Sequence, residues 1–130
     1  MPLVTFCPKN SEIESDLISQ MEHLRAVVKT ALWNVWEIPV HDAVVNLHKS
    51  AFAVEPDEYT ADLVVLLETT PNRNLEKRAD LLRNTLARAL IANSDLYNLS
   101  IEIWIRFIPG SWCLVEEGEI KESVEHELNN

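Results

Sequence analysis

The sequence predicts an α/β (α+β) domain in which two tandem βαβ units form a four-stranded sheet with two helices on one face. Two observations support this prediction. Short apolar segments and amphipathic helical stretches follow one another in the order strand, helix, strand, and this order occurs twice. Each expected helix has about 20 residues, which is long enough to cross over between parallel neighbouring strands. A chain of 130 residues fits a single domain.

The first unit is expected at residues 2–49. Its first strand is the apolar segment at residues 3–6. Apolar side chains then recur at steps of three and four over residues 13–35, which is typical of an amphipathic helix, and Asn10 or Ser11 can cap its N-terminus. Pro39 is expected to end this helix, and a second strand follows at residues 43–48.

The second unit is expected at residues 61–108, after an irregular connection at residues 50–60. Residues 62–69 form a nearly continuous apolar run, typical of a strand that is buried on both faces. A turn at residues 71–74, an apolar helical stripe over residues 75–90 and an alternating strand at residues 101–107 complete the unit. A ferredoxin-like fold has the same order of elements, so element order alone leaves that alternative open.

Composition excludes several classes of function. A net charge of −10 would repel a phosphate backbone, so we expect no nucleic-acid partner. The two cysteines, Cys7 and Cys113, belong to no metal-binding pattern, so we expect buried thiols in a reducing compartment and no zinc or iron site. No apolar run has the length of a membrane span and no secretory leader pattern is present, which favours a cytoplasmic protein without a membrane partner. The acidic tail at residues 113–130 is expected to be solvated.

Pro2 is the first candidate for chemistry, because it lies between the initiator Met1 and the first strand. Removal of Met1 would make the secondary amine of Pro2 the N-terminus. Loss of solvation at the end of a buried strand would lower the pKa of this amine, which makes it a candidate acid or base near neutral pH. A retained Met1 would instead leave an amide nitrogen without basicity, and Pro2 would then be an ordinary second residue.

Three local patterns resemble one family. Pro2-Leu3 begins the first strand, residues 39–42 have the form Pro-x-x-Asp before the second strand, and residues 70–76 resemble an arginine turn before the second helix. In this order and spacing, over roughly residues 2–112, the chain resembles the tautomerase superfamily, whose members use an N-terminal proline. It looks most like members with two fused units, such as malonate semialdehyde decarboxylase and 5-carboxymethyl-2-hydroxymuconate isomerase.

The resemblance implies a homotrimer that acts without a cofactor on a small carboxylate substrate. Pro2 would be the catalytic base, Arg73 would bind the substrate carboxylate, and Asp42 and Trp112 would set the environment of the amine. Each residue also has a structural alternative. Arg73 could be a surface arginine paired with Glu76 or Asp80, Asp42 could cap the turn into the second strand, and Trp112 could be a packing or interface residue.

Two departures bear on the reaction. Pro71 stands where the decarboxylase members have the first of two arginines, and no glycine directly follows Trp112. The sequence therefore favours a tautomerase that moves a proton alpha to the carbonyl of a small 2-hydroxy-dienoate or 2-oxo acid. Decarboxylation of a 3-oxo acid and a non-catalytic trimeric binding module are the alternatives.

Overall fold

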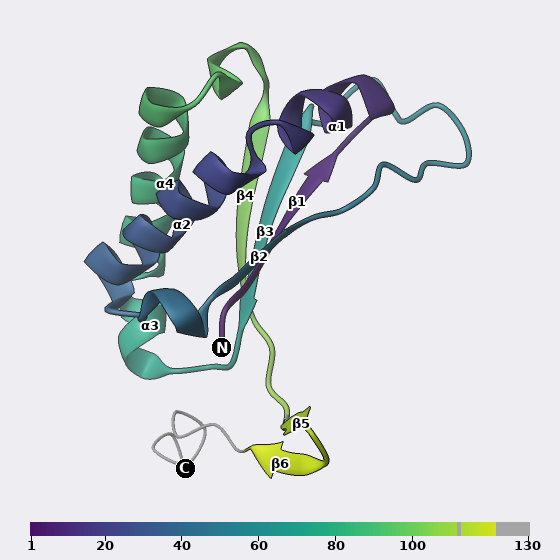
Figure 1. The fold of residues 1–130 in the computed structure, drawn as a ribbon. Helices are drawn as coiled ribbons and strands as arrows, with labels where there is room; N and C mark the ends of the chain where they lie inside the picture. The colour runs from purple at the N-terminus through teal and green to yellow at the C-terminus, as the bar shows by residue number, and fades with distance from the viewer. Residues whose placement is uncertain (112, 122–130) are drawn as a thin grey trace.

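The computed structural model describes residues 1–111 and 113–121. Its main feature is a four-stranded sheet in the order β2-β1-β3-β4 (Figure 1). The strands are β1 (Leu3–Pro8), β2 (Val44–Leu47), β3 (Leu63–Thr69) and β4 (Ile101–Phe107). Strand β1 is parallel to β2, β3 is parallel to β4, and the central pair β1 and β3 is antiparallel. The predicted α+β fold class is confirmed.

This topology separates the predicted fold from its ferredoxin-like alternative. In each half of the chain, the two strands that a helical crossover joins are direct neighbours in the sheet. In a ferredoxin-like fold the corresponding βαβ units are split, with another strand inserted between the two. The antiparallel contact of β1 with β3 then joins the two halves into one continuous sheet.

The helical segment of the first half consists of two helices rather than the single helix expected over residues 13–35. Helix α1 (Ser11–Ile18) and helix α2 (Met21–Trp36) are separated at Ser19 and Gln20. Both of these side chains donate hydrogen bonds to the backbone carbonyl of Asp16, at 3.1 and 3.2 Å. Such local bonds compete with helical hydrogen bonding. The predicted cap at Asn10 is confirmed, because its Oδ1 accepts a hydrogen bond from the Ile13 amide at 2.9 Å.

The second crossover is also divided, into α3 (Arg73–Lys77) and α4 (Ala79–Asn93). The side chain of Asn72 caps α3 by accepting hydrogen bonds from the amides of Asn74 and Leu75. Two short 3₁₀ turns, η1 (Val40–Asp42) and η2 (Leu96–Asn98), precede β2 and β4. None of the helices within the described ranges is long and apolar enough to cross a membrane.

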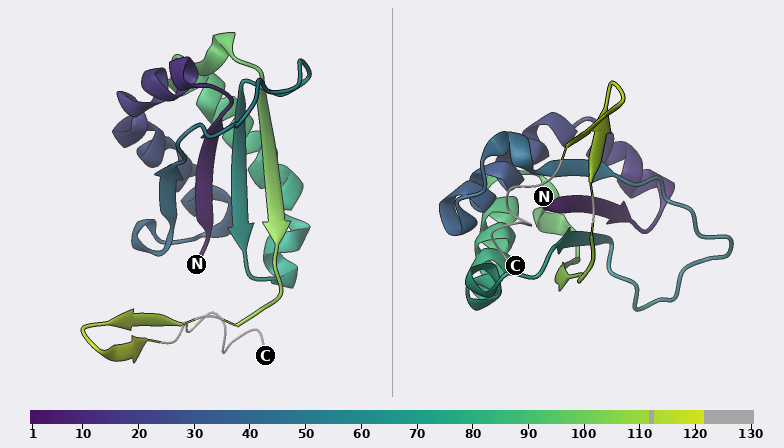
Figure 2. Two further views of the ribbon diagram at one scale, coloured as in Figure 1. Left: turned by 90° about the vertical axis from the view of Figure 1, so that its right-hand side faces the viewer. Right: turned by 90° about the horizontal axis from the view of Figure 1, so that it is seen from below.

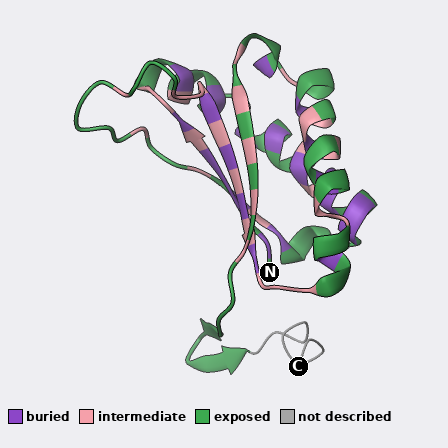
Figure 3. Ribbon diagram, turned by 180° about the vertical axis from the view of Figure 1, so that it is seen from behind, coloured by how far each residue is buried: buried purple, intermediate pink, exposed green. Residues whose placement is uncertain are grey.

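The core lies between the sheet and helices α2 and α4, which cover one of its faces (Figures 1 and 3). Apolar side chains that point toward the helices alternate with outward ones along each strand, as the two-residue period of a strand requires. Completely buried members of this core are Val4, Phe6, Leu17, Leu24, Val28, Leu32, Leu63, Val65, Leu67, Leu82, Leu86 and Leu90.

The other face of the sheet has no covering layer in the described chain, and it is turned toward the viewer in the left view of Figure 2. The expectation that β3 is buried on both faces is therefore wrong for the isolated chain. Leu63, Val65 and Leu67 are buried against the helices, whereas Val64 and Leu66 on the opposite face are partly exposed. We call this uncovered side the open face.

The acidic C-terminal segment contains a β-hairpin that was not predicted from the sequence. Strands β5 (Leu114–Glu116) and β6 (Glu119–Lys121) form a two-stranded antiparallel hairpin that extends away from the main sheet (Figures 1 and 2). Its turn residues Glu117 and Gly118 both have positive φ angles, of 50° and 81°, as the tight turn of a two-residue hairpin loop requires. The described residues of this hairpin are exposed, and the rest of the expected acidic tail, residues 122–130, lies outside the described residues.

Candidate active site

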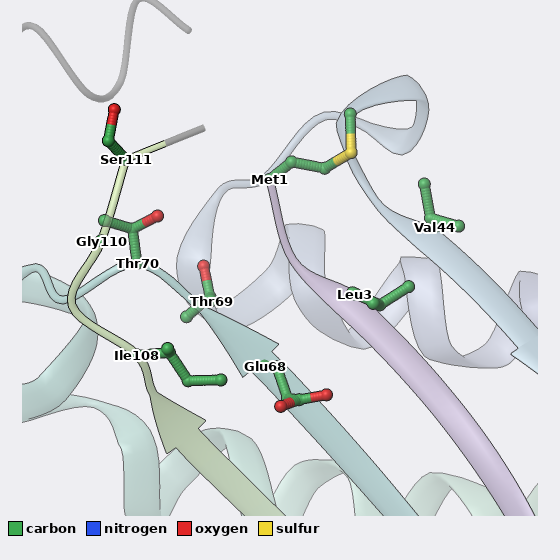
Figure 4. A pocket seen from close by; sticks show the side chains of 9 residues that line it. All are labelled: Met1, Leu3, Val44, Glu68, Thr69, Thr70, Ile108, Gly110 and Ser111. Atoms are coloured by element: carbon green, nitrogen blue, oxygen red, sulfur yellow. The ribbon is translucent and has the colours of Figure 1, made fainter. Parts of the chain in front are cut away.

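A cavity of about 440 Å³ lies at the end of the sheet where β1 begins (Figure 4). Four chain segments form it: the start of β1, the start of β2, the end of β3 and the segment after β4. These ends meet because β1 is parallel to β2 and antiparallel to β3, whose neighbour β4 runs in the same direction as β3. The lining residues are Met1, Leu3, Val44, Glu68, Thr69, Thr70, Ile108, Gly110 and Ser111.

The walls of this cavity are mainly apolar, with a few polar groups. Hydroxyl groups come from Thr69, Thr70 and Ser111. Glu68 is the one ionisable side chain among the described lining residues. Concave, largely apolar surfaces with a small number of polar groups are typical of sites for small molecules.

Pro2 is buried and is not itself among the described lining residues, although its neighbours Met1 and Leu3 both line the cavity. Its carbonyl oxygen accepts a hydrogen bond from the Val44 amide at 3.0 Å, which fixes the start of β1 against β2. The Pro2 nitrogen is bonded to Met1, and Met1 itself lines the cavity. Removal of Met1 would therefore leave the secondary amine of Pro2 beside the cavity.

Arg73 is the first residue of α3, three positions after the cavity-lining Thr70. It is exposed and is not one of the described lining residues. The alternative pairing with Asp80 is not observed, since that carboxylate forms an ion pair with Arg83 at 3.2 Å.

Asp42 is the last residue of η1, two positions before the cavity-lining Val44. Its backbone amide donates a hydrogen bond to the carbonyl of Pro39 at 2.9 Å, and its carboxylate lies 3.5 Å from His41 Nε2. The carboxylate is exposed and does not line the cavity. Trp112, the remaining predicted site residue, lies outside the described residues.

Glu68 lines the cavity but was not predicted from the sequence as a site residue. The strand pattern placed it on β3, but its position in the cavity depends on the pairing of β3 with β1, in which Glu68 lies opposite Leu3. Arg106 of β4 lies opposite Glu68 on the other side, with 3.7 Å between Arg106 Nη1 and Glu68 Oε2. The acidic residue just before the arginine turn was the available signal in the sequence.

We find no group of three or more histidine, cysteine, aspartate or glutamate side chains arranged to hold a metal ion in the part of the chain that the structure describes. The described lining residues offer a carboxylate, hydroxyl groups and the chain terminus for chemistry at the cavity.

No protein-family model matches the sequence, and no curated protein matches it. Solved structures do match the fold. A malonate semialdehyde decarboxylase, studied for its decarboxylase and hydratase activities, is 13% identical with a TM-score of 0.56, and the match covers 90% of this chain and 92% of that one. A macrophage migration inhibitory factor-like protein from Entamoeba histolytica is 12% identical with a TM-score of 0.53, covering 84% and 88% of the two chains.

A fused 4-OT that forms an asymmetric trimer is 14% identical with a TM-score of 0.53, and the match covers 92% of this chain and 94% of that one. These neighbours are members of the tautomerase superfamily. At such low identity the likeness shows the fold alone, so the chain has a tautomerase-like fold and its reaction must be argued from the site.

Proposed function

We propose that this protein is a cofactor-independent tautomerase that moves a proton alpha to the carbonyl of a small 2-hydroxy-dienoate or 2-oxo acid. The observation that carries this proposal is the cavity at the start of β1, which Met1 lines and beside which the Pro2 nitrogen would become a free amine. The tautomerase-like fold supports the same assignment, since the neighbours include enzymes of that superfamily.

In the proposed reaction, Pro2 is a general base that operates without a metal. Its neutral nitrogen takes the proton of the 2-hydroxyl group, the electron pair of that O–H bond forms the carbonyl, and the π pair of the conjugated C=C bond moves onto the carbon that will be protonated. The protonated amine then returns a proton to carbon, which yields the 2-oxo acid and restores the base. A base with a pKa near the working pH suits both steps.

Arg73 is proposed to bind the substrate carboxylate, because a guanidinium donates paired hydrogen bonds to such a group. Its position just after the cavity-lining residues Thr69 and Thr70 supports this role. Asp42 and Trp112 are proposed to set the environment of the amine. These three assignments come from the resemblance and from the place of each residue along the chain.

The decisive experiment begins with the intact mass of the protein purified from its own host. Loss of Met1 is expected, and the Met1-free protein should convert the enol of phenylenolpyruvate or 2-hydroxymuconate into the keto form, which ultraviolet absorbance can follow. Pro2→Ala should reduce this rate while circular dichroism shows an intact fold. A retained Met1, or equal rates for Pro2→Ala and the unchanged chain, would contradict the proposal.

Two alternatives have separate outcomes in the same assays. A 3-oxo acid decarboxylase would release carbon dioxide from a 3-oxo acid and would not change the enol substrates. A non-catalytic trimeric module is favoured by one observation, namely that Arg73 and Asp42 do not line the cavity of the isolated chain. It would bind small carboxylates without turnover.

A further inference from the structure

Glu68 brings a negative charge into the cavity at the chain terminus. It lies directly opposite Leu3 in the pairing of β1 with β3, so the two side chains project from the same face of the sheet. Pro2 is the next residue toward the terminus. Figure 4 shows Glu68 between Leu3 on one side and Ile108 on the other. About three quarters of the Glu68 side chain is removed from solvent, since its exposed fraction is 26%.

The surroundings of Glu68 leave its carboxylate only partly neutralised. Arg106 Nη1 lies 3.7 Å from one carboxylate oxygen, and 57% of the Arg106 side chain is exposed. An ion pair of this length and exposure is weak. The field of Glu68 also extends along β1. Burial first, and then the negative charge of Glu68, raise the pKa of the Cys7 thiol above its usual value.

We propose that Glu68 is the ion-pair partner of the Pro2 ammonium in the chain that has lost Met1, and that it positions this amine at the cavity. The proposal rests on the proposed function in one respect, the removal of Met1. Glu68 acts through the amine and is therefore a positioning residue. Its carboxylate would accept a hydrogen bond from the protonated nitrogen and hold the cation after each proton uptake.

The expected consequence is a higher pKa of the Pro2 amine than desolvation alone would give, because an opposite charge stabilises the protonated form. Arg106 on β4 opposes this effect, since its positive charge disfavours a second cation nearby. Other ionisable side chains near this end of the sheet are His41 and Asp42 in η1 and Arg73 at the start of α3, none of which is among the described lining residues. The described lining residues of β2 and of the segment after β4 carry no ionisable side chain.

The test measures the titration of the Pro2 amine directly, without relying on activity. Cys7 provides a native junction for chemical ligation. A synthetic peptide of residues 2–6 that carries ¹⁵N-labelled Pro2 can be joined through a C-terminal thioester to the expressed segment that begins at Cys7. This route gives the complete chain without Met1. The ¹⁵N chemical shift of Pro2 is then followed against pH.

Glu68→Gln is expected to lower the titration midpoint of the amine by about one pH unit, the lower end of the effect of an opposite charge at about 4–6 Å. Arg106→Gln is expected to raise the midpoint, because it removes a competing cation. Glu102→Gln is the matched control, since Glu102 is exposed on the same sheet face and accepts a hydrogen bond from Trp104 Nε1 at 3.3 Å. Its midpoint should equal that of the unchanged chain.

An equal midpoint in Glu68→Gln and the unchanged chain would overturn the proposal. If Glu68→Gln fails to refold, the Pro2 midpoint in Arg106→Gln provides the test instead. A midpoint equal to that of the unchanged chain would then overturn the proposal. The enol assay on the same samples separates this proposal from the proposed function. If the unchanged chain converts the enol substrates but Glu68→Gln does not shift the Pro2 midpoint, only the role of Glu68 is refuted. If Glu68→Gln shifts the midpoint but the unchanged chain converts no enol substrate, the ion pair is supported and the tautomerase activity is refuted.

Discussion

The proposed role of Arg73, which is to bind the substrate carboxylate, can be tested by substitution. It is exposed at the start of α3, and neither of the acids considered as partners in the sequence holds it in an observed ion pair. If it binds the substrate carboxylate, Arg73→Ala should lower kcat/KM by more than about tenfold, because hydrogen bonds to charged groups contribute about 1.5–3 kcal/mol. Steady-state kinetics with the enol substrates would measure this loss.

Arg88→Ala is the matched control for Arg73. Arg88 is exposed on α4, and within residues 1–111 and 113–121 it forms no ion pair that meets ordinary distance limits. Its replacement should leave kcat/KM unchanged. Equal losses in the two variants would indicate a general charge effect and would remove Arg73 from the site.

Asp62 connects three chain segments through its carboxylate and backbone. Lys9 Nζ lies 2.7 Å from Asp62 Oδ1, and the Ser100 amide donates to Oδ2 at 3.0 Å. The hydrogen bond from Lys9, followed by that from the Ser100 backbone, lowers the pKa of the Asp62 carboxyl below its usual value. These contacts hold the start of β3 against the end of β1 and the start of β4.

A group whose pKa is lower in the folded state stabilises the fold above its unfolded pKa and loses this effect as pH falls through the folded pKa. Asp62→Asn should therefore lower the thermal midpoint at pH 7 by about 2–4 °C. The difference from the unchanged chain should shrink as the pH falls below the ordinary aspartate pKa of about 3.9. Differential scanning calorimetry at several pH values would measure it, and a constant difference would contradict this account.

At the level of elements, Arg78 joins the two helical crossovers. It lies between α3 and α4, and its Nη1 donates a hydrogen bond to the carbonyl of Val35 in the last turn of α2 at 2.5 Å. A cation beside the C-terminal carbonyls of a helix also interacts favourably with the helix dipole. Arg78→Ala should lower the free energy of unfolding by about 1–2 kcal/mol, measured by urea denaturation.

Arg83→Ala provides the comparison for Arg78. The Arg83 pair with Asp80 is three positions apart on the exposed surface of α4, so it should contribute only about 0.2–0.5 kcal/mol. If both variants lose the same free energy of unfolding, the hydrogen bond from Arg78 to α2 contributes no more than the surface ion pair of Arg83.

The end of α2 depends on an unfavourable backbone conformation at Glu37. This residue is left-handed, with φ of 56°, and its amide donates to the carbonyl of Trp33 at 3.0 Å while the Ile38 amide reaches Leu32 at 3.4 Å. Glycine adopts this conformation without steric cost. Glu37→Gly should raise the free energy of unfolding by about 0.5–1 kcal/mol.

Glu22→Gly tests whether the gain at Glu37 comes from its backbone angle. Glu22 lies in the first turn of α2, where glycine should lower the free energy of unfolding by about 1 kcal/mol. The two substitutions should therefore change urea midpoints in opposite directions. A loss of stability in both would refute the role of the left-handed conformation.

For the whole molecule, the strands and helices that have a regular apolar period could be predicted from the sequence. The alternation at residues 101–107 identified β4 because outward Glu102, Trp104 and Arg106 interrupt the apolar series. The break between α1 and α2 could not be seen in the same way, since the apolar stripe stays in phase through Leu17 and Met21. That break is marked by the side-chain bonds to the Asp16 carbonyl and by the backbone hydrogen bond from the Gln20 amide to the Leu17 carbonyl at 3.0 Å.

The site was predicted less completely, for a reason of topology. Pro2 was identified from its place in the chain, but the cavity beside it is formed by strands from both halves. Glu68 belongs to it because β3 pairs antiparallel with β1, a register that no local pattern specifies. The roles of Arg73, Asp42 and Trp112 came from a family resemblance and stay predictions.

The open face of the sheet leads to the last prediction, that the protein is a homotrimer. This face leaves Leu3, Val64, Leu66 and Trp104 partly or largely exposed, and strands β2 and β4 are edges of the main sheet. Apolar faces and free edges of sheets are commonly covered by association with other chains. In a closed symmetric assembly, each copy has the same surface covered. Multi-angle light scattering at about 10 μM should give three times the mass of one chain.

Leu66→Arg should dissociate this trimer, because it places a charge at the centre of the open face on β3. Circular dichroism should still show the folded monomer, since the helix-covered face of the sheet is unchanged. Val54→Arg, in the exposed connection between β2 and β3, is the control and should stay trimeric. A monodisperse monomer in the unchanged chain would contradict the prediction, because the open face would then be stable in water without a second copy.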